Sequence, residues 1–233
     1  MSKSDYIFKY IYLHVCTLNN WVDIVSSIFK RLDENNAFDH IDQLRVSILG
    51  DKQALENDIW NFHPKIVICQ HNTNKLLYEK FTLDRIRDDA INSKNEFYVF
   101  YLHSKGVTDV WQNHDMTRKN SIWRNEMIHA GFFNLKDTLL NLKHVSAIGT
   151  RLKNMGIGAH FSGNFWWSKS THIKLLEPVL PKYLDSERWI LSKIGSTAQL
   201  RDYLGRYINT FVVNKIIYAG DWGEDVTYPI FNA

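Results

Sequence analysis

Cysteine is scarce in this sequence. The 233 residues include two cysteines, Cys16 and Cys69, and each lies in an apolar, strand-like run. Neither belongs to a Cys-x-x-Cys pair or to a Cys/His pattern with metal-ligand spacing, which excludes the common zinc and thiol-redox motifs. We therefore expect two buried free thiols in a reducing compartment such as the cytosol.

Long apolar runs are also missing. No stretch of about 18 apolar residues occurs, so we expect no transmembrane segment. The opening MSKSDYIFKYIYLHVC lacks the clean apolar stretch and the small-residue cleavage site of a secretory signal. Both absences favour a cytoplasmic protein.

An excess of one charge is missing too. The formal net charge is +3, and the basic residues are scattered, which argues against a nucleic-acid partner. Aromatic residues, in contrast, make up 14% of the chain. A surplus of Trp and Tyr often lines sites for ligands with flat or hydroxyl-rich surfaces.

Strand-like and helix-like stretches alternate through the first two-thirds of the chain. Apolar, β-branched and aromatic residues predict strands at 6–16, 43–50, 65–70, 96–106, 144–150, 160–167 and 207–220. Helical spacing of apolar residues predicts helices at 19–32, 75–91, 120–135 and 186–194. This order predicts an α/β fold with a mostly parallel central sheet flanked by helices. No linker, repeat or low-complexity tract divides residues 1–233, so we expect a single domain.

Polar residues follow several of the predicted strands. Because the carboxyl ends of parallel strands meet at one edge of a sheet, these residues are candidates for a ligand site. His14, Thr17, Leu18 and Asn19 end the first strand, where a nucleotide base commonly binds in such sheets. The alternative is an ordinary helix start with Asn19 or Asn20 as the N-cap.

The fourth strand delivers His103, Ser104, Lys105 and Gly106 to the same edge. A lysine beside a glycine can approach a phosphate closely, offering a point charge and unobstructed backbone amides. The spacing of a P-loop is absent. The alternative is an exposed lysine in a turn.

Helix 75–91 carries the polar residues Glu79, Thr82, Arg87 and Asp88. Most charges on such a helix are merely solvated, and we retain Thr82, Arg87 and Asp88 as candidates.

Two further pairs have ordinary structural explanations. Trp123 and Arg124 predict a core tryptophan beside a surface arginine. Asp185 and Glu187 open a predicted helix, where the helix dipole favours acidic residues.

Six stretches resemble a known family when taken together and in this order. They are LHVCTLNN, YEKFTLDRI, FYVFYLHSKGV, WRNEM, HFSGNFWWSKS and SERWI. The chain is similar over nearly its whole length to small GT-A glycosyltransferases. These include the nucleotide-sugar-dependent domain that chloroviruses encode for capsid glycans, and bacterial polysaccharide-type proteins with YLHTKG and GNFWW stretches. The many Asn, Ile and Lys residues would fit an AT-rich viral genome, and hence a host-cytoplasmic location.

The resemblance implies a Rossmann-like GT-A domain that transfers a sugar from a nucleotide sugar, expected to be a UDP-sugar, to a hydroxyl of a glycan or glycoprotein. The loop after the first strand would hold uracil, and the strand-four loop would approach the diphosphate. The GNFWW strand and the acidic helix would face the acceptor. Glu187 is the favoured catalytic carboxylate and Asp185 the second candidate, with Asp185 the better N-cap. A helix N-terminus would lower the pKa of either carboxyl.

The double tryptophan then acquires a role. Neighbouring residues of a strand face opposite sides, so one of Trp166 and Trp167 is expected in the core and the other in the acceptor cleft, stacked on a sugar. Sugar hydroxyls would reach His160 or Asn164, while Gly163 lets a ligand or a neighbouring backbone come close. The alternative is that both indoles are buried.

One departure from the family concerns the metal. Many GT-A enzymes hold Mn²⁺ or Mg²⁺ with an Asp-x-Asp, and this sequence contains none. His103 is the candidate ligand in its place, but Lys105 would compete with a cation or would compensate the diphosphate charge directly. Metal dependence stays open, as does a second class of function: a non-catalytic nucleotide-sugar or carbohydrate-binding module. An NAD enzyme has little support, since no GxGxxG follows the first strand.

Overall fold

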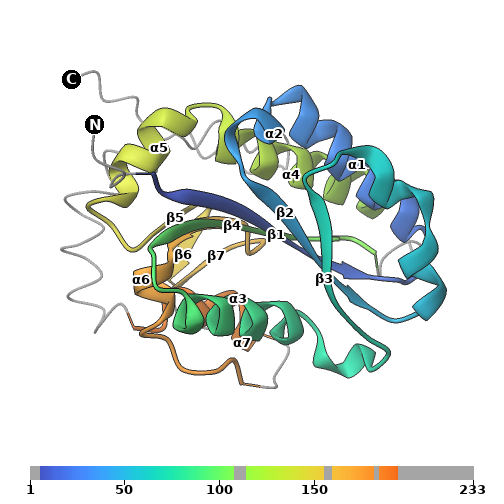
Figure 1. The fold of residues 1–233 in the computed structure, drawn as a ribbon. Coiled ribbons are helices and arrows are strands. Elements are labelled where there is room, and N and C mark those ends of the chain that lie inside the picture. Colours follow the sequence, from blue (N-terminus) through green and yellow to red (C-terminus); the bar gives the residue numbers. More distant parts are fainter. Residues whose placement is uncertain (1–5, 108–113, 155–158, 181–183, 194–233) are drawn as a thin grey trace.

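A six-stranded sheet runs through the centre of the molecule (Figure 1), with the strand order β3-β2-β1-β4-β8-β5. The computed structural model describes residues 6–107, 114–154, 159–180 and 184–193. The strands of the sheet are β1 (Phe8–Cys16), β2 (Gln43–Leu49), β3 (Ile66–Asn72), β4 (Phe97–His103), β5 (Ala147–Gly149) and β8 (Trp166–Lys169). Only β8 runs antiparallel to its neighbours among these strands. The predicted α/β fold with a mostly parallel sheet is therefore confirmed, while the strand expected at 207–220 lies outside the described residues.

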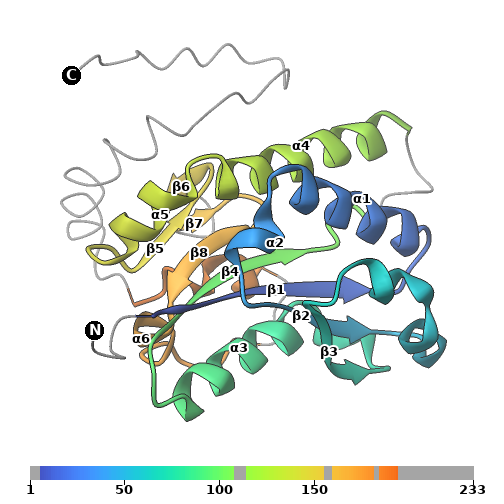
Figure 2. The ribbon, with the colours of Figure 1, turned by 45° about the horizontal axis from the view of Figure 1, so that its top comes forward.

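Helices cover both faces of this sheet (Figures 1 and 2). One face carries α1 (Trp21–Glu34), α2 (Ala37–His40), α4 (His114–Phe132) and α5 (Leu135–Leu142). The other carries α3 (Lys80–Asn92), α6 (Ser170–Ile173) and α7 (Asp185–Trp189). The connections contain the 3-10 helices η1 (Lys52–Glu56), η2 (Asp58–Phe62) and η3 (Lys75–Leu77), and β6 (Leu152–Asn154) pairs with β7 (Ala159–Phe161) as a separate ribbon. No helix in the described ranges is long and apolar enough to cross a membrane.

Side chains alternate between the two faces along each strand, which produces two cores. Ile11, Leu13 and Val15 of β1 pack on the α1 side, whereas Tyr12 packs on the α3 side. Since both faces are covered, the strands are apolar on both sides, which explains their nearly continuous apolar sequences.

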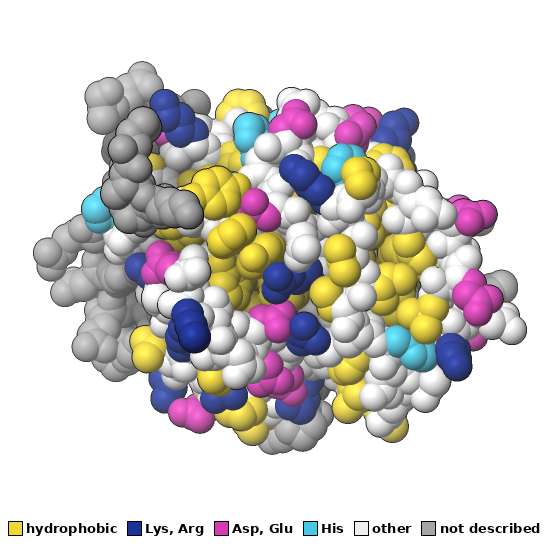
Figure 3. Space-filling view, in the orientation of Figure 1, with side chains coloured by type: hydrophobic (Ala, Val, Ile, Leu, Met, Phe, Trp, Pro, Cys, Tyr) yellow, Lys and Arg dark blue, Asp and Glu magenta, His cyan; other side chains and the backbone are white. Residues whose placement is uncertain are grey.

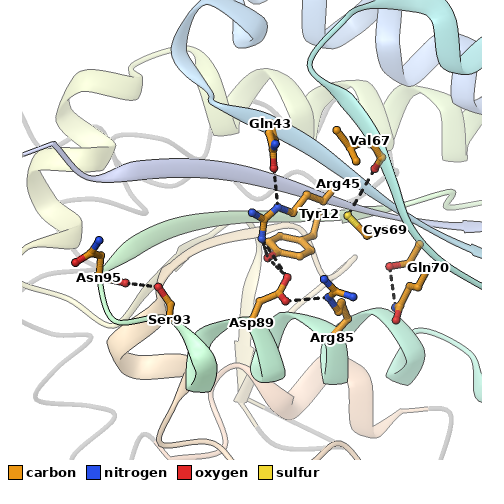
Figure 4. A network of polar contacts seen from close by, with 11 residues as sticks. Tyr12, Gln43, Arg45, Val67, Cys69, Gln70, Arg85, Asp89, Ser93 and Asn95 are labelled. Carbon is orange, nitrogen blue, oxygen red and sulfur yellow. Dashed lines mark hydrogen bonds and ion pairs between the residues drawn. The ribbon is translucent and has the colours of Figure 1, made fainter.

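A partly buried polar network ties α3 to the sheet (Figure 4). The hydroxyl of Tyr12 donates to Asp89 Oδ2 at 2.7 Å, and Arg45 Nη1 lies 3.1 Å from the same oxygen. Arg85 Nε donates to Asp89 Oδ1 at 2.9 Å. Both oxygens of this carboxylate are thus occupied, which fixes the position of α3 against β1 and β2.

The aromatic stretch 160–167 differs from the single strand that we expected. It contains the end of β7, a turn, and the start of β8. Gly163 (φ +93°) and Asn164 (φ +56°) both adopt left-handed backbone conformations, which interrupt an extended strand. The turn swings the chain from the β6–β7 ribbon into the central sheet.

The surface shows mixed charge. On the face drawn in Figure 3, acidic and basic side chains are interspersed rather than gathered by sign, as the small net charge suggested. Both cysteines are free, and both are half-buried rather than fully buried as expected.

Candidate functional site

The strand order reverses between β1 and β4. From β1 the chain builds outward to β2 and β3, and α3 then returns it to β4 on the other side of β1. Helices α1 and α3 lie on opposite faces of the sheet (Figure 1), and the usual ligand position in such sheets is beside this reversal, at the carboxyl ends of the strands. His14 and His103 are paired in register at this edge.

The loops after these two strands are joined by hydrogen bonds. The amide of Ser104 donates to the His14 carbonyl at 2.9 Å, and the amide of Cys16 donates to Ser104 Oγ at 3.1 Å. Further out, Asn19 Nδ2 donates to the Val107 carbonyl at 2.7 Å. Ser104 is therefore buried in a structural role and does not offer its hydroxyl oxygen to a ligand, contrary to expectation.

Thr17 has a similar role at the neighbouring loop. Its hydroxyl donates to the Leu49 carbonyl at 3.2 Å and accepts from the Asp51 amide at 2.7 Å. Leu18 packs against the core. Thr17 and Leu18, both expected to contact the donor, instead fix the loop after β1.

A carboxylate lies below this edge, at the start of α3. Glu79 Oε2 accepts from the Tyr101 hydroxyl at 2.8 Å and from Asn164 Nδ2 at 2.7 Å, and Glu79 Oε1 lies 3.9 Å from His103 Nε2. His14 Nδ1 is 2.7 Å from Thr82 Oγ1 on the same helix. The predicted candidates His14, Thr82 and His103 are thus brought together around Glu79.

The protonation states of this cluster follow from burial and from each other. Burial lowers the pKa of His14 to about 4 and also lowers the pKa of His103, although Glu79 opposes both changes. Burial alone would raise the pKa of Glu79, but the two imidazoles and the two donated hydrogen bonds outweigh it and lower the pKa. At neutral pH the cluster therefore holds one carboxylate and two neutral imidazoles.

Asn164 links this cluster to the sheet and to α7. Trp166 Nε1 donates to Asn164 Oδ1 at 2.9 Å, and Asn164 Nδ2 also donates to the Ser186 carbonyl at 3.3 Å. Asn164 is 0% exposed, so its amide is used inside the protein. The expectation that it contacts a sugar hydroxyl is wrong.

Glu187 is the carboxylate of α7 that faces the site. Its side chain is 30% exposed, and Oε2 lies 4.0 Å from Nε2 of the buried His160. Burial, and then the charge of Glu79, raise the pKa of Glu187, while Lys105 and other cations oppose the rise. The pKa was expected to fall; α7 spans five residues, and its short dipole does not overcome desolvation.

Asp185 has a different environment. It is buried and forms an ion pair with Arg188 one turn later on α7. The N-cap of α7 is Leu184, so the predicted capping role of Asp185 is wrong. Glu187 is thus the better placed of the two carboxylates for chemistry.

Lys105 and Gly106 form the turn after β4. Lys105 Nζ lies 4.0 Å from the ring centroid of Trp123 on α4, a cation–π distance. Gly106 has φ +89°, and a Cβ there would lie 2.9 Å from Asn120 Cβ, so glycine is required. Arg124 Nη1 donates to the Lys105 carbonyl at 2.8 Å. Arg124 is buried while Trp123 is only partly so, the reverse of the expected pattern.

The double tryptophan differs from the expected arrangement of one core indole and one exposed indole. Trp166 and Trp167 do point to opposite faces, but each is 1% exposed. Trp166 packs against Tyr101 on the α3 side, and Trp167 packs against Phe100 on the α4 side. No sugar platform is present here because helices cover both faces.

Gly163 approaches a helix rather than a ligand. A Cβ at this position would lie 2.6 Å from Met127 Sδ and 3.0 Å from Trp123 Cζ2, both on α4. The close neighbours are thus side chains of α4, not the ligand or backbone that we expected, and the contact packs the β7–β8 turn against α4.

Arg87 and Asp88 do not join the site. They follow Thr82 on α3 by five and six residues, about 7–9 Å farther along the helix axis. Arg87 Nε donates to the Leu176 carbonyl at 2.7 Å, and Asp88 is exposed. The structure therefore does not bring them together with His14 and His103, because α3 runs away from the strand-order reversal.

Glu79 belongs to this group of site residues, although we did not keep it among the candidates that the sequence offered. The signal was present: Glu79 shares one helical face with Thr82, Leu83 and Ile86, all of which are buried. A carboxylate on the apolar side of a helix requires partners, and buried partnered carboxylates are candidates for function.

A divalent metal does not fit the residues described. Within those ranges, no group of three or more His, Cys, Asp and Glu side chains is placed to hold an ion. His103 Nε2 lies 3.1 Å from the Gly163 carbonyl and is used there. We derive no step through a metal.

Comparison with known proteins identifies a family. No curated protein matches the chain. Among solved structures, it is similar to 4-diphosphocytidyl-2C-methyl-D-erythritol synthase from Anaerococcus prevotii, with 13% identity, a TM-score of 0.38, and coverage of 85% of this chain and 83% of the other. A family model described as domain of unknown function DUF8361 matches residues 10–195. Since that match spans well over half of the chain, the protein belongs to the DUF8361 family.

Proposed function

We propose that the protein is a glycosyltransferase that moves a sugar from a nucleotide sugar, such as a UDP-sugar, to a hydroxyl of a glycan acceptor. The observation that carries this proposal is the group of His14, Glu79 and His103 at the strand-order reversal, with Lys105 in the next turn. Ligands bind in α/β sheets at such a reversal, and a lysine there suits a diphosphate.

Two features favour catalysis at this site over ligand binding alone. Glu187 has a raised pKa and remains partly exposed beside His160. A carboxylate whose pKa moves toward neutrality is a better general base than an ordinary one. In addition, the charge of Lys105 lowers the pKa of both His103 and Glu187.

The proposed reaction uses these residues as follows. Glu187 accepts the proton of the acceptor hydroxyl as its oxygen bonds to the anomeric carbon. The bond from that carbon to the diphosphate oxygen breaks, and the nucleoside diphosphate leaves with the electron pair. Lys105 stabilises the charge that develops on it. Glu79 stays ionised and holds Tyr101 and Asn164 in place.

The test is a donor screen on the full chain. Thermal shift with UDP-, GDP- and CMP-sugars, with and without Mn²⁺, identifies the donor, and a ligand at 100 times its Kd should stabilise by about 2.7 kcal/mol. Hydrolysis of that donor without acceptor then measures turnover. Binding with slow hydrolysis that depends on Glu187 supports the proposal.

Two results count against a transferase. Binding without hydrolysis or transfer by any acceptor preparation would favour a nucleotide-sugar or carbohydrate-binding module. Absence of binding to every nucleotide sugar would remove the proposal altogether.

A further inference from the structure

Arg124 is a buried cation without an acidic partner in the described part of the chain. It is 4% exposed, and within the described residues it makes one hydrogen bond, from Nη1 to the Lys105 carbonyl at 2.8 Å. Its Nε is buried and has no acceptor. A guanidinium has five N–H groups in a planar fork, so most of its donor capacity is unused.

Such an arrangement is costly without an anion beside it. Moving a charge out of water costs several kcal/mol unless a partner compensates it. The partly buried Arg45, in contrast, is compensated by Asp89. Burial lowers the pKa of Arg124 to about 10, which leaves it protonated at neutral pH. A neutral amide would serve equally well to hold a single carbonyl.

The guanidinium of Arg124 contacts the turn that follows β4. Its Nη1 donates to the Lys105 carbonyl of that turn, and its charge also contributes to lowering the pKa of His103 at the end of β4. Lys105 itself belongs to this turn, so the turn has two cations. Two positive charges and a glycine turn at a sheet edge together suit a phosphate.

We propose that Arg124 is an anion-binding residue that takes a phosphate group of the bound ligand, and that this phosphate compensates its buried charge. The proposal rests on the proposed function for the identity of the ligand, a nucleoside diphosphate, but not for the chemistry of the anion. Arg124 would hold the diphosphate through a fork of two N–H groups, with Lys105 as the second charge.

The experiment compares Arg124→Gln and Arg124→Met with Arg151→Gln, on the full chain. Arg151 lies over the Trp123 ring that Lys105 also contacts, but it is paired with Glu126, so it serves as a control arginine near the same turn. Calorimetry measures affinity for inorganic pyrophosphate, inorganic phosphate and UDP, and thermal unfolding is recorded without ligand. We expect both Arg124 variants to lose at least tenfold in affinity for pyrophosphate and UDP, and Arg151→Gln to change it by less than threefold.

Unfolding supplies the second readout. Because Arg124 is an uncompensated charge, at least one of its two variants should unfold at or above the wild-type temperature, and that variant should still lose the anion. Wild-type affinity in a folded Arg124 variant, or unfolding of both variants, would overturn the proposal. Arg124-dependent binding of pyrophosphate without donor turnover would remove the glycosyltransferase and keep the anion site. Donor turnover that is unchanged in both Arg124 variants would remove the anion site and keep the glycosyltransferase.

Discussion

Asn164 Nδ2 lies 2.7 Å from Glu79 Oε2, and this hydrogen bond joins the β7–β8 turn to the start of α3. The same Asn164 accepts from Trp166 and donates to Ser186 of α7. One buried amide therefore connects the sheet, α3 and the helix that carries Glu187. The floor of the candidate site and the packing of the core share this connection, so a change in one is expected to alter the other.

Glu79→Gln tests the connection. Tyr101 and Asn164 both donate to Glu79 Oε2, so a glutamine carbonyl can still accept from both, but only as a neutral group. A hydrogen bond to a charged group contributes about 1.5–3 kcal/mol and one between neutral groups about 0.5–1.5 kcal/mol. We expect the free energy of unfolding to fall by about 1–3 kcal/mol in urea titrations. Glu34→Gln is the control, since Glu34 forms an exposed pair with Arg31, and it should change stability by about 0.5 kcal/mol or less. Equal stability of the two variants would contradict the role of Glu79.

Trp166→Ala and Trp167→Ala should each destabilise the protein by about 3–5 kcal/mol, because both indoles are buried in well-packed cores. Thermal unfolding measures both. Leu140→Ala is the control, since Leu140 is exposed on α5 and its removal should have little effect. A wild-type melting temperature for either tryptophan variant would mean that the indole is not a core residue.

Much of the fold was predictable because apolar runs define the strands. The predicted strand 43–50 and the observed β2 agree within one residue, and β4 ends at His103 as the polar sequence after it suggested. Once the strands are parallel, geometry brings His14 and His103 to one edge. That part of the site needed no tertiary information.

The remaining assignments depended on which surfaces are covered. Trp166 and Trp167 differ in direction, as period-2 geometry requires, but whether a face is open depends on the positions of helices far away in sequence. Arg124 illustrates the same point: it lies on one helical stripe with Met127 and Ile128, yet only packing against the β4 turn buries it. Arg87 lies apart from the expected site for a simpler reason: α3 runs away from the strand-order reversal.

His14 should make stability depend on pH. Its pKa is about 4 when folded and its ordinary value is 6.5, so the unfolded chain binds a proton first as pH falls. The stability that neutral His14 contributes is complete above pH 6.5 and is lost progressively down to about pH 4, by about 3 kcal/mol. The lowered pKa of His103 acts in the same direction. Urea unfolding at intervals between pH 4 and pH 7.5 measures the slope.

His14→Gln is the matched variant for that measurement. It removes the titrating group and keeps an amide able to bond Thr82, so the loss of stability on acidification should be shallower than in wild type. Identical slopes for the two proteins would show that His14 does not titrate in this range.

Glu187→Gln and Asp185→Asn separate a catalytic carboxylate from a structural one. Glu187 is partly exposed beside His160, whereas Asp185 is buried in its ion pair with Arg188. If Glu187 accepts the acceptor proton, Glu187→Gln should lower turnover by about 10²–10⁴-fold with little change in donor affinity. Asp185→Asn should lower the melting temperature and leave turnover of the folded protein within a few-fold of wild type.

The pH profile gives this last prediction a signature that misfolding cannot imitate. A general base must be deprotonated, so turnover should decline as pH falls through the pKa of Glu187, which burial and Glu79 place above the ordinary value for a glutamate. The decline should be absent from the residual activity of Glu187→Gln. Should Glu187→Gln retain near-full turnover with the same acid limb, the proton goes elsewhere, and His160, the imidazole 4.0 Å from Glu187, becomes the group to test.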